Sequence, residues 1–156
     1  MSALDAIFKA SDVRGTVPEQ LDAELARAIG VGFATFAKEE AAGRGDTVSR
    51  VLVARDMRPS GVELSAAFAD GVQSQGLDVV DLGLGSTDLL YFASGSMDAP
   101  GAMFTASHNP AQYNGAKFCL AGARPVGEDT GLDRIREVGA AALAGDVAPA
   151  ATEGSR

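Results

Sequence analysis

Short apolar runs alternate with longer stretches of helical spacing along this 156-residue chain. Four runs are apolar enough to form buried strands, and they cover residues 51–54, 77–82, 101–104 and 116–120. Apolar positions three and four residues apart predict helices elsewhere: after Asp22 as N-cap, from Ser60 or Gly61, over 89–94 and over 129–143. This alternation predicts the α/β class, with a three-layer α/β/α sandwich and right-handed crossovers.

The predicted sheet is mixed and mostly parallel. The strands at 101–104 and 116–120 are joined by a loop that contains the turn dipeptides Asn109-Pro110 and Asn114-Gly115. A hairpin of this kind makes its two strands antiparallel, whereas strands separated by helices are expected to run parallel.

The two ends of the chain have weaker patterns. Residues 7–15 are predicted to open as a short strand that runs into a turn, and Thr87 is predicted to cap the helix that follows it. Residues 124–126 continue an edge segment. We therefore expect one domain over residues 1–145, followed by a tail or truncated linker over 146–156, which has no periodicity.

Composition narrows the class of protein. Hydrophobic residues make up 46% and charged residues 22%, as in ordinary globular domains. The net charge of −8 argues against a nucleic-acid binder, and no apolar run approaches the length of a membrane span. The single cysteine, Cys119, lies in an apolar strand and is expected to be inert core. With no visible signal peptide, the expected location is the cytoplasm.

Residues Thr105–Lys117 hold an unusual concentration of reactive side chains. They include Ser107, Asn109, Lys117 and the only histidine of the chain, His108. The preceding strand ends in a tight loop, which we expect to lift Ser107 and His108 off the sheet. Backbone N–H groups of such a loop can bind an anion. A polar hairpin loop, in which the serine and asparagine cap local N–H groups, is the structural alternative.

Two other kinds of site fit the residues poorly. A serine hydrolase needs a histidine that meets the serine in space, but His108 is the sequence neighbour of Ser107, and no Gly-x-Ser-x-Gly motif is present. The glycines at 83–85 suggest a dinucleotide site, but Asp88 stands where the third glycine is needed, and an acid there would repel pyrophosphate.

Arginines outside this loop are further candidates. Arg14, beside Gly15, could reach a phosphate with its planar guanidinium, although it could equally be a surface arginine in a turn. Residues 55–61 follow the strand at 51–54, at the strand end where open α/β sheets bind ligands. We interpret them as a brace under the Ser107 loop, with a simple structural ion pair as the alternative.

The sequence Thr-Ala-Ser-His-Asn-Pro at 105–110, with Tyr-Asn-Gly-Ala-Lys at 113–117, resembles the phosphoserine loop of the alpha-D-phosphohexomutases, which are phosphomannomutases and phosphoglucomutases. The segments at 8–15 and 54–60 also resemble family motifs. The chain departs from the family pattern at Ser11 (tyrosine in the family), Ala54 (glycine) and Ser86-Thr87-Asp88 (Pro-Thr-Pro). The resemblance covers nearly the whole chain, but only the first of the family's four domains.

The resemblance implies an isomerase in which Ser107 is phosphorylated. Ser107 would give its phosphoryl group to a hexose monophosphate and take the other phosphate back from the bisphosphosugar, which interconverts hexose 1-phosphate and 6-phosphate. His108 and Lys117 match positions that move the proton and stabilise charge, and Arg14 and Lys117 match substrate-binding positions. Mg²⁺ would bind the Ser107 phosphate, and glucose or mannose 1,6-bisphosphate would be the activator.

The family's other domains supply the remaining magnesium ligands, the choice of sugar and the cradle for the distal phosphate. No Asp-Gly-Asp-x-Asp loop, the family's magnesium motif, occurs in this chain. We therefore expect an N-terminal domain that is inactive alone. Its expected partners are a hexose phosphate and domains II–IV of the same enzyme, or a second copy of the fragment. A non-catalytic sugar-phosphate-binding or interaction module is the alternative function.

Overall fold

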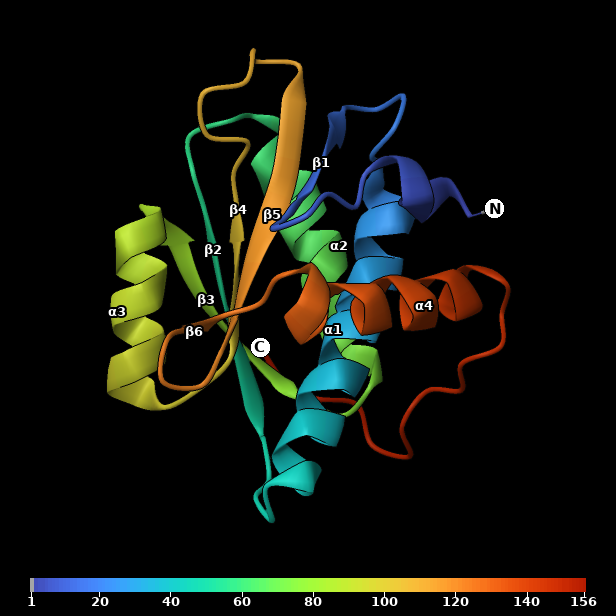
Figure 1. The fold of residues 1–156 in the computed structure, drawn as a ribbon, viewed down its shortest axis with the longest axis vertical. Coiled ribbons are helices and arrows are strands. Elements are labelled where there is room, and N and C mark those ends of the chain that lie inside the picture. Colours follow the sequence, from blue (N-terminus) through green and yellow to red (C-terminus); the bar gives the residue numbers. More distant parts are fainter. Residues whose placement is uncertain (1) are drawn as a thin grey trace.

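A computed structural model describes residues 2–156, which form a mixed sheet with helices on both faces (Figure 1). The elements in chain order are η1 (Ala3–Ala6), β1 (Val13–Thr16), α1 (Ala23–Gly43), β2 (Arg50–Arg55), α2 (Ser60–Ser74), β3 (Asp78–Leu84), α3 (Thr87–Met97), β4 (Gly101–Phe104), β5 (Tyr113–Leu120), β6 (Arg124–Pro125), η2 (Glu128–Thr130) and α4 (Leu132–Leu143). The predicted α/β sandwich is confirmed.

The six strands are ordered β1-β5-β4-β2-β3, and β6 pairs with β5. Strand β2 pairs in parallel with both β3 and β4, whereas β5 pairs antiparallel with β4, β1 and β6. The mixed sheet is as expected, but parallel pairing is confined to β4, β2 and β3. The hairpin reverses β5 relative to β4, and every strand added beyond that point runs antiparallel to β5.

Two apolar layers hold the sheet between its helices. Helices α1, α2 and α4 cover one face, where Phe33 of α1, Phe68 of α2 and Phe118 of β5 pack together; the rings of Phe33 and Phe118 stack with centroids 5.0 Å apart. Helix α3 covers the other face, over Met103 of β4 and Cys119 of β5. Both faces of the central strands are therefore buried, as their continuous apolar runs indicate.

Most helix boundaries follow the predicted signals. The Asp22 cap of α1 is confirmed, because Asp22 Oδ1 accepts the Leu25 N–H at 2.9 Å. Helix α3 is capped by Ser86 and not by Thr87, which is its first residue. The helix predicted over 129–143 is confirmed from Leu132 to Leu143, but its start is wrong, because Glu128–Thr130 form the separate element η2. Gly131 has a φ of +143°, which separates η2 from α4.

The segments near both ends of the chain differ from their predicted structure. Near the N-terminus the turn precedes the strand: the Lys9 N–H donates to the Asp12 carbonyl at 2.8 Å, so Arg14 lies in β1 and not in a turn. Residues 146–156 contain no helix or strand, yet they pack on the domain. The Ala150 N–H donates to the Ser74 carbonyl, and the Val79 N–H to the Ser155 carbonyl. Within the described residues, no helix has both the length and the apolarity to cross a membrane.

Candidate functional site

The loop between β4 and β5 projects from one end of the sheet, beside the carboxyl ends of β2 and β4 (Figure 1). Ser107 and His108 are both exposed at this loop, as predicted. Ser107 has a φ of +54°, in the left-handed region that non-glycine residues seldom adopt. Such a conformation persists only where surrounding contacts enforce it.

Arg58 supplies those contacts from beneath the loop. Its side chain is only 8% exposed. Its Nη2 donates to the carbonyls of Ser107 and Asn109, both at 2.9 Å, and its Nη1 donates to the carbonyls of Pro110 and Tyr113 at 2.8 and 2.9 Å. One guanidinium thus holds three loop carbonyls and the first carbonyl of β5, as the brace interpretation predicted.

Asp56 fixes Arg58 in turn. The carboxylate of Asp56 lies 3.4 Å from Arg58 Nε and accepts the Arg58 backbone N–H at 3.1 Å. The backbone N–H of Asp56 donates to the carbonyl of Phe104, the last residue of β4, at 3.0 Å. The brace is therefore anchored to the same strand that leads into the Ser107 loop, and the buried positive charge of Arg58 has a counter-charge.

The loop also bonds to itself. The Ser107 N–H donates to Thr105 Oγ1 at 3.0 Å, and Asn109 donates to the Ala106 carbonyl through both its backbone and its side chain. Local capping of this kind is the structural alternative stated above. It occupies the Thr105 hydroxyl and the Asn109 amide, and it leaves the Ser107 hydroxyl exposed at the tip.

The brace also orients a free donor. Because a trans peptide is planar, the Ser107 carbonyl that points to Arg58 directs the N–H of His108 the opposite way, out of the loop. Within residues 2–156 this N–H has no acceptor. The His108 N–H is therefore a candidate donor to an anion bound at this loop.

Arg14 and Lys117 lie on the same face of the sheet, next to this loop. Arg14 of β1 is opposite Gly115 of β5, and Lys117 is two residues further along β5. Opposite residues of antiparallel strands share a face, and diagonal neighbours lie about 7–8 Å apart. The Gly115 carbonyl accepts the Thr105 N–H at 3.0 Å, which joins this pair of cations to the start of the Ser107 loop.

Gly115 allows β1 to approach β5 closely. A Cβ at this position would collide with the carbonyl oxygen of Val13 and would lie 3.1 Å from the Cα of Arg14. Any other residue here would push β1 away from β5. The place of Arg14 in the site thus depends on the absence of a side chain at Gly115.

Asp12 is a neighbour of the site that the sequence did not indicate. Its side chain is buried, and Oδ1 lies 3.6 Å from Arg14 Nη2. Within the described residues, Asp12 Oδ1 and Arg14 Nε make no hydrogen bond. The arginine keeps 37% of its side chain exposed, so the guanidinium is held by charge at the surface and has donors to spare.

The predicted turn at Asn114-Gly115 is wrong, because β5 begins at Tyr113 and both residues pair with β1, whereas Cys119 has its predicted structural role. Asn114 is fully buried, and it joins β5 to the start of α2 through a 2.8 Å bond from Nδ2 to Ser60 Oγ. Cys119 is also fully buried, and burial raises the pKa of its thiol. A neutral buried thiol is a poor nucleophile, in agreement with the predicted inert role.

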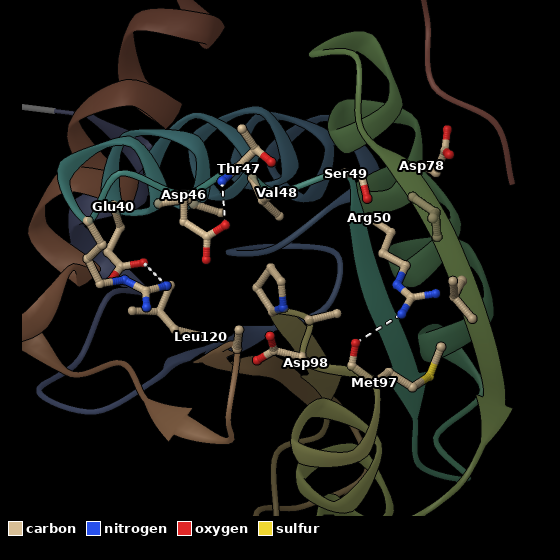
Figure 2. A pocket seen from close by; sticks show the side chains of 18 of the residues that line it. Glu40, Asp46, Thr47, Val48, Ser49, Arg50, Asp78, Met97, Asp98 and Leu120 are labelled. Atoms are coloured by element: carbon tan, nitrogen blue, oxygen red, sulfur yellow. Dashed lines mark hydrogen bonds and ion pairs between the residues drawn. The ribbon is translucent and has the colours of Figure 1, made fainter.

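A cavity of about 620 Å³ lies at the opposite end of the sheet, where β2 and β3 begin (Figure 2). Its lining carries four carboxylates and two arginines: Glu40, Asp46, Asp78, Asp98, Arg44 and Arg50. Glu40 is ion-paired with Arg44, and Arg50 donates to the Met97 carbonyl, as Figure 2 shows for Arg50. This excess of negative charge is unsuited to a phosphate ligand, and the cavity includes none of the predicted site residues.

The described residues do not build a metal site of their own. No three His, Cys, Asp or Glu side chains between residues 2 and 156 converge in a way that could hold a metal ion. The carboxylates of this chain therefore do not supply the ligand set for the expected Mg²⁺.

Fold and loop together define a class of protein: an α/β/α domain with an exposed serine on the loop that follows β4, next to strands that carry Arg14 and Lys117. Residues 5–142 match the family described as "Phosphoglucomutase/phosphomannomutase, alpha/beta/alpha domain I". The chain belongs to this family.

Individual relatives agree with the family match. The chain is 40% identical over 150 residues to "Phosphohexose mutases" of Xanthomonas campestris pv. campestris, which covers 96% of the chain and 32% of that relative. It is 38% identical over 130 residues to a "Phosphomannomutase" of Vibrio cholerae, covering 83% of the chain and 27% of that relative. A crystal structure of a phosphoglucomutase/phosphomannomutase family protein from Burkholderia thailandensis superposes with a TM-score of 0.75 at 35% identity, covering 96% of the chain and 32% of that structure. The chain thus spans about a third of the length of these relatives.

Proposed function

We propose that this chain is the phosphoserine-bearing domain of a phosphohexomutase, with Ser107 Oγ as the phosphate carrier. The observation that supports this most is the exposed Ser107 hydroxyl on a loop that Arg58 holds in a left-handed conformation. In a member of the phosphoglucomutase/phosphomannomutase family, such a rigid exposed hydroxyl is the natural acceptor and donor of a phosphoryl group.

The reaction has two phosphoryl transfers. In the first, the Oγ–P bond of phosphorylated Ser107 breaks while a P–O bond forms to a free hydroxyl of a hexose monophosphate; that hydroxyl loses its proton and Ser107 Oγ gains one. The bisphosphosugar then presents its other phosphate, whose bond to the sugar oxygen breaks as phosphorus bonds to Ser107 Oγ. The Ser107 proton leaves, the sugar oxygen gains a proton, and the phosphoserine is restored.

Each nearby group has a role in this scheme. Phosphoryl transfer has a loose transition state, so catalysis rests on positioning and on charge stabilisation. Lys117 and Arg14 supply positive charge in a chain whose net charge is −8, and the guanidinium of Arg14 can bond two phosphate oxygens. His108 carries the proton to and from the sugar hydroxyl, and its backbone N–H donates to the transferred group.

Mg²⁺ and a hexose 1,6-bisphosphate activator complete the proposal. When bound, the metal ion would neutralise charge on the Ser107 phosphate. Since the carboxylates of this chain do not form a metal site, the other ligands must come from outside the described residues.

A coupled mutase assay with glucose 1,6-bisphosphate tests the proposal. We define the grafted enzyme as residues 1–156 joined to the part of the Xanthomonas campestris relative that follows its matched segment. The 156-residue chain alone should show no turnover, because the rest of the substrate site lies elsewhere. The grafted enzyme should turn over, and Ser107→Ala should lower its kcat by more than about 10³-fold. His108→Ala should cost about 10²–10⁴-fold.

The control is Ser49→Ala, an exposed serine at the opposite end of the sheet, which should leave kcat unchanged. If Ser107→Ala keeps a kcat within tenfold of the unsubstituted grafted enzyme, Ser107 is not the carrier. Turnover by the 156-residue chain alone, at the rate of the grafted enzyme, would contradict the claim that this domain is incomplete. Sugar-phosphate binding without any Ser107-dependent turnover would favour the binding-module alternative.

A further inference from the structure

The two arginines of the site use their side-chain N–H donors in opposite ways. Arg58 is buried, and it commits its terminal nitrogens to four carbonyls. Arg14 is ion-paired with Asp12, but within residues 2–156 its guanidinium donates no hydrogen bond. The other ion-paired arginines in this part of the chain all donate at least one: Arg44, Arg124, Arg134, Arg136 and Arg156. Arg14 thus combines a paired charge with unused donors.

The Asp12 carboxylate is poorly compensated for a buried acid. The residue is 9% exposed, and Oδ1 has no hydrogen-bond donor among the described residues. Burial of a carboxylate costs free energy unless donors or an opposite charge offset it. The ion pair with Arg14, at 3.6 Å, is the single one that Asp12 makes in the described part of the chain. An acid placed in this way contributes little to stability, so its position beside Arg14 indicates a role in the site.

Backbone bonds hold the turn that carries Asp12. The Lys9 N–H donates to the Asp12 carbonyl at 2.8 Å, and the Glu128 N–H donates to the Ala10 carbonyl at 2.8 Å. These bonds anchor the turn within itself and to η2. Neither involves the Asp12 side chain, so the backbone brings the carboxylate to Arg14, and a change of side chain at Asp12 should leave the turn in place.

Strand β1 fixes the backbone of Arg14 but not its side chain. A long arginine side chain has many rotamers, and ordering them on binding costs free energy. Attraction to the buried Asp12 carboxylate favours the rotamers that keep the guanidinium beside the turn. Because this attraction uses no hydrogen bond, the N–H donors stay available, and a guanidinium can bond two phosphate oxygens at once. Donors that are ordered in advance bind an anion with a smaller loss of entropy.

We propose that Asp12 is the positioning residue for Arg14: its carboxylate holds the guanidinium in place by charge and leaves the N–H donors to a substrate phosphate. Asp12 Oδ1 is closed to solvent, so Asp12 acts through Arg14 and does not itself bind the phosphate, which a carboxylate would repel. This role rests on the proposed function for the identity of the ligand, and it adds a residue that orients the phosphate donor.

Asp12→Ala in the grafted enzyme tests this role by activity. The variant should lower kcat/KM by about 10–100-fold, because a small displacement of a binding group costs that much. Arg14→Ala should cost at least as much. Asp12→Ala should cause no further loss in a grafted enzyme that already carries Arg14→Ala, because Asp12 acts only through Arg14. Asp133→Ala is the matched control: it removes an exposed, ion-paired carboxylate on α4 and should leave kcat/KM unchanged.

Stability separates positioning from a merely structural role. Asp12→Ala should shift the Tm of the 156-residue chain by less than about 3 °C, because the turn is held by its backbone and Arg14, 37% exposed, can be hydrated. A loss of kcat/KM that is accompanied by a much larger fall in Tm would overturn the proposal in favour of a structural role. Additive losses in the double variant would also overturn it, as would a kcat/KM of Asp12→Ala within about twofold of the unsubstituted enzyme.

A spectroscopic measurement does not depend on turnover. Because Arg14 Nε is buried and unbonded, its N–H should exchange with water about tenfold more slowly than the Nε–H of Arg27, an exposed arginine of α1, in nitrogen–proton NMR spectra of the 156-residue chain. Asp12→Ala should remove this difference, and Asp133→Ala should preserve it. Equal exchange at the two arginines of the unsubstituted chain, or slow exchange that survives Asp12→Ala, would overturn the proposal.

Ser107→Ala separates this inference from the proposed function. If Ser107→Ala abolishes turnover while Asp12→Ala keeps it, the role of Asp12 is refuted and the phosphate carrier stands. If Ser107→Ala keeps turnover, the carrier is refuted, and the exchange of the Arg14 Nε–H still decides whether Asp12 holds the guanidinium.

Discussion

At the scale of single residues, the Ser107 loop depends on one buried arginine. A loop of polar residues would otherwise be free to adopt several conformations, and the left-handed φ of Ser107 costs about 1–2 kcal/mol relative to an ordinary one. Four hydrogen bonds from the Arg58 guanidinium offset this cost, because each bond to a charged group contributes more than a neutral one.

Arg58→Lys should therefore destabilise the domain although it keeps the charge. An ammonium on a flexible stem cannot reach four carbonyls in a plane. We expect a loss of about 1–3 kcal/mol in the free energy of unfolding, measured with urea, and faster proteolysis within residues 105–112. Arg44→Lys is the matched control, since Arg44 is exposed and its replacement should change stability by less than about 0.5 kcal/mol. Equal stability of the two variants would show that Arg58 does not hold the loop.

The sequence identified the reactive residues of the loop and the brace beneath it, because these residues form contiguous motifs. It did not indicate that Asp12 faces Arg14. Asp12 ends the turn before β1 and Arg14 lies within β1, so their meeting depends on this turn, which brings the Asp12 carboxylate to 3.6 Å from the guanidinium. A buried acid of this kind has no pattern of its own in the sequence.

At the scale of elements, the predictions succeeded where a pattern is local. The apolar run at 101–104 coincides with β4, and Asp22 caps α1 as expected. The order of turn and strand before Arg14 was wrong because β1 is defined by pairing with β5, which no local pattern shows. The break before α4 was missed because Gly131 reads as an ordinary helical position until Phe36 packs against it.

Gly115 is the element-scale determinant of the site, and Gly115→Ala tests it. The added methyl collides with the Val13 carbonyl, so β1 must shift. We expect a loss of about 1–3 kcal/mol by urea unfolding, with lower kcat/KM in the grafted enzyme because Arg14 moves with β1. Gly95→Ala is the control: a Cβ there meets nothing within 4 Å, and an exposed helix position should gain about 0.5–1 kcal/mol. The same sign of change for both variants would contradict this account.

Helices α1 and α4 are linked by an ion pair with a predicted pH dependence. Arg134 donates to both carboxylate oxygens of Glu39, at 2.9 and 2.8 Å, and these bonds lower the pKa of Glu39. A lowered carboxyl pKa in the folded state stabilises the fold above the unfolded pKa, and the stabilisation is lost as the pH falls through the folded value.

The comparison is between the unsubstituted chain and Glu39→Gln in urea unfolding. Because both side chains are about half exposed, the difference should be no more than about 1 kcal/mol near pH 7. It should vanish as the pH falls below about 4 and should shrink in about 1 M salt. A difference that stays constant from neutral pH to about pH 2 would show that the pair contributes through packing and not through charge.

At the scale of the whole molecule, the Ser107 loop and the acidic cavity lie at opposite ends of the sheet. The loop that carries Ser107 follows the carboxyl end of β4, and Arg14 and Lys117 lie on the neighbouring strands β1 and β5 (Figure 1). The acidic cavity of Figure 2 lies at the far end. In a chain with a net charge of −8, four carboxylates line the cavity at the far end, whereas Arg14 and Lys117 lie on strands next to the Ser107 loop.

Peptide mapping of the grafted enzyme tests the central claim most directly. After incubation with glucose 1,6-bisphosphate and Mg²⁺, the peptide that contains Ser107 should carry one phosphate, and that phosphate should be lost when excess hexose monophosphate is added. Ser107→Ala should abolish the label. A grafted enzyme that turns over while its Ser107 peptide stays unmodified, or carries its phosphate on another residue, would contradict the account.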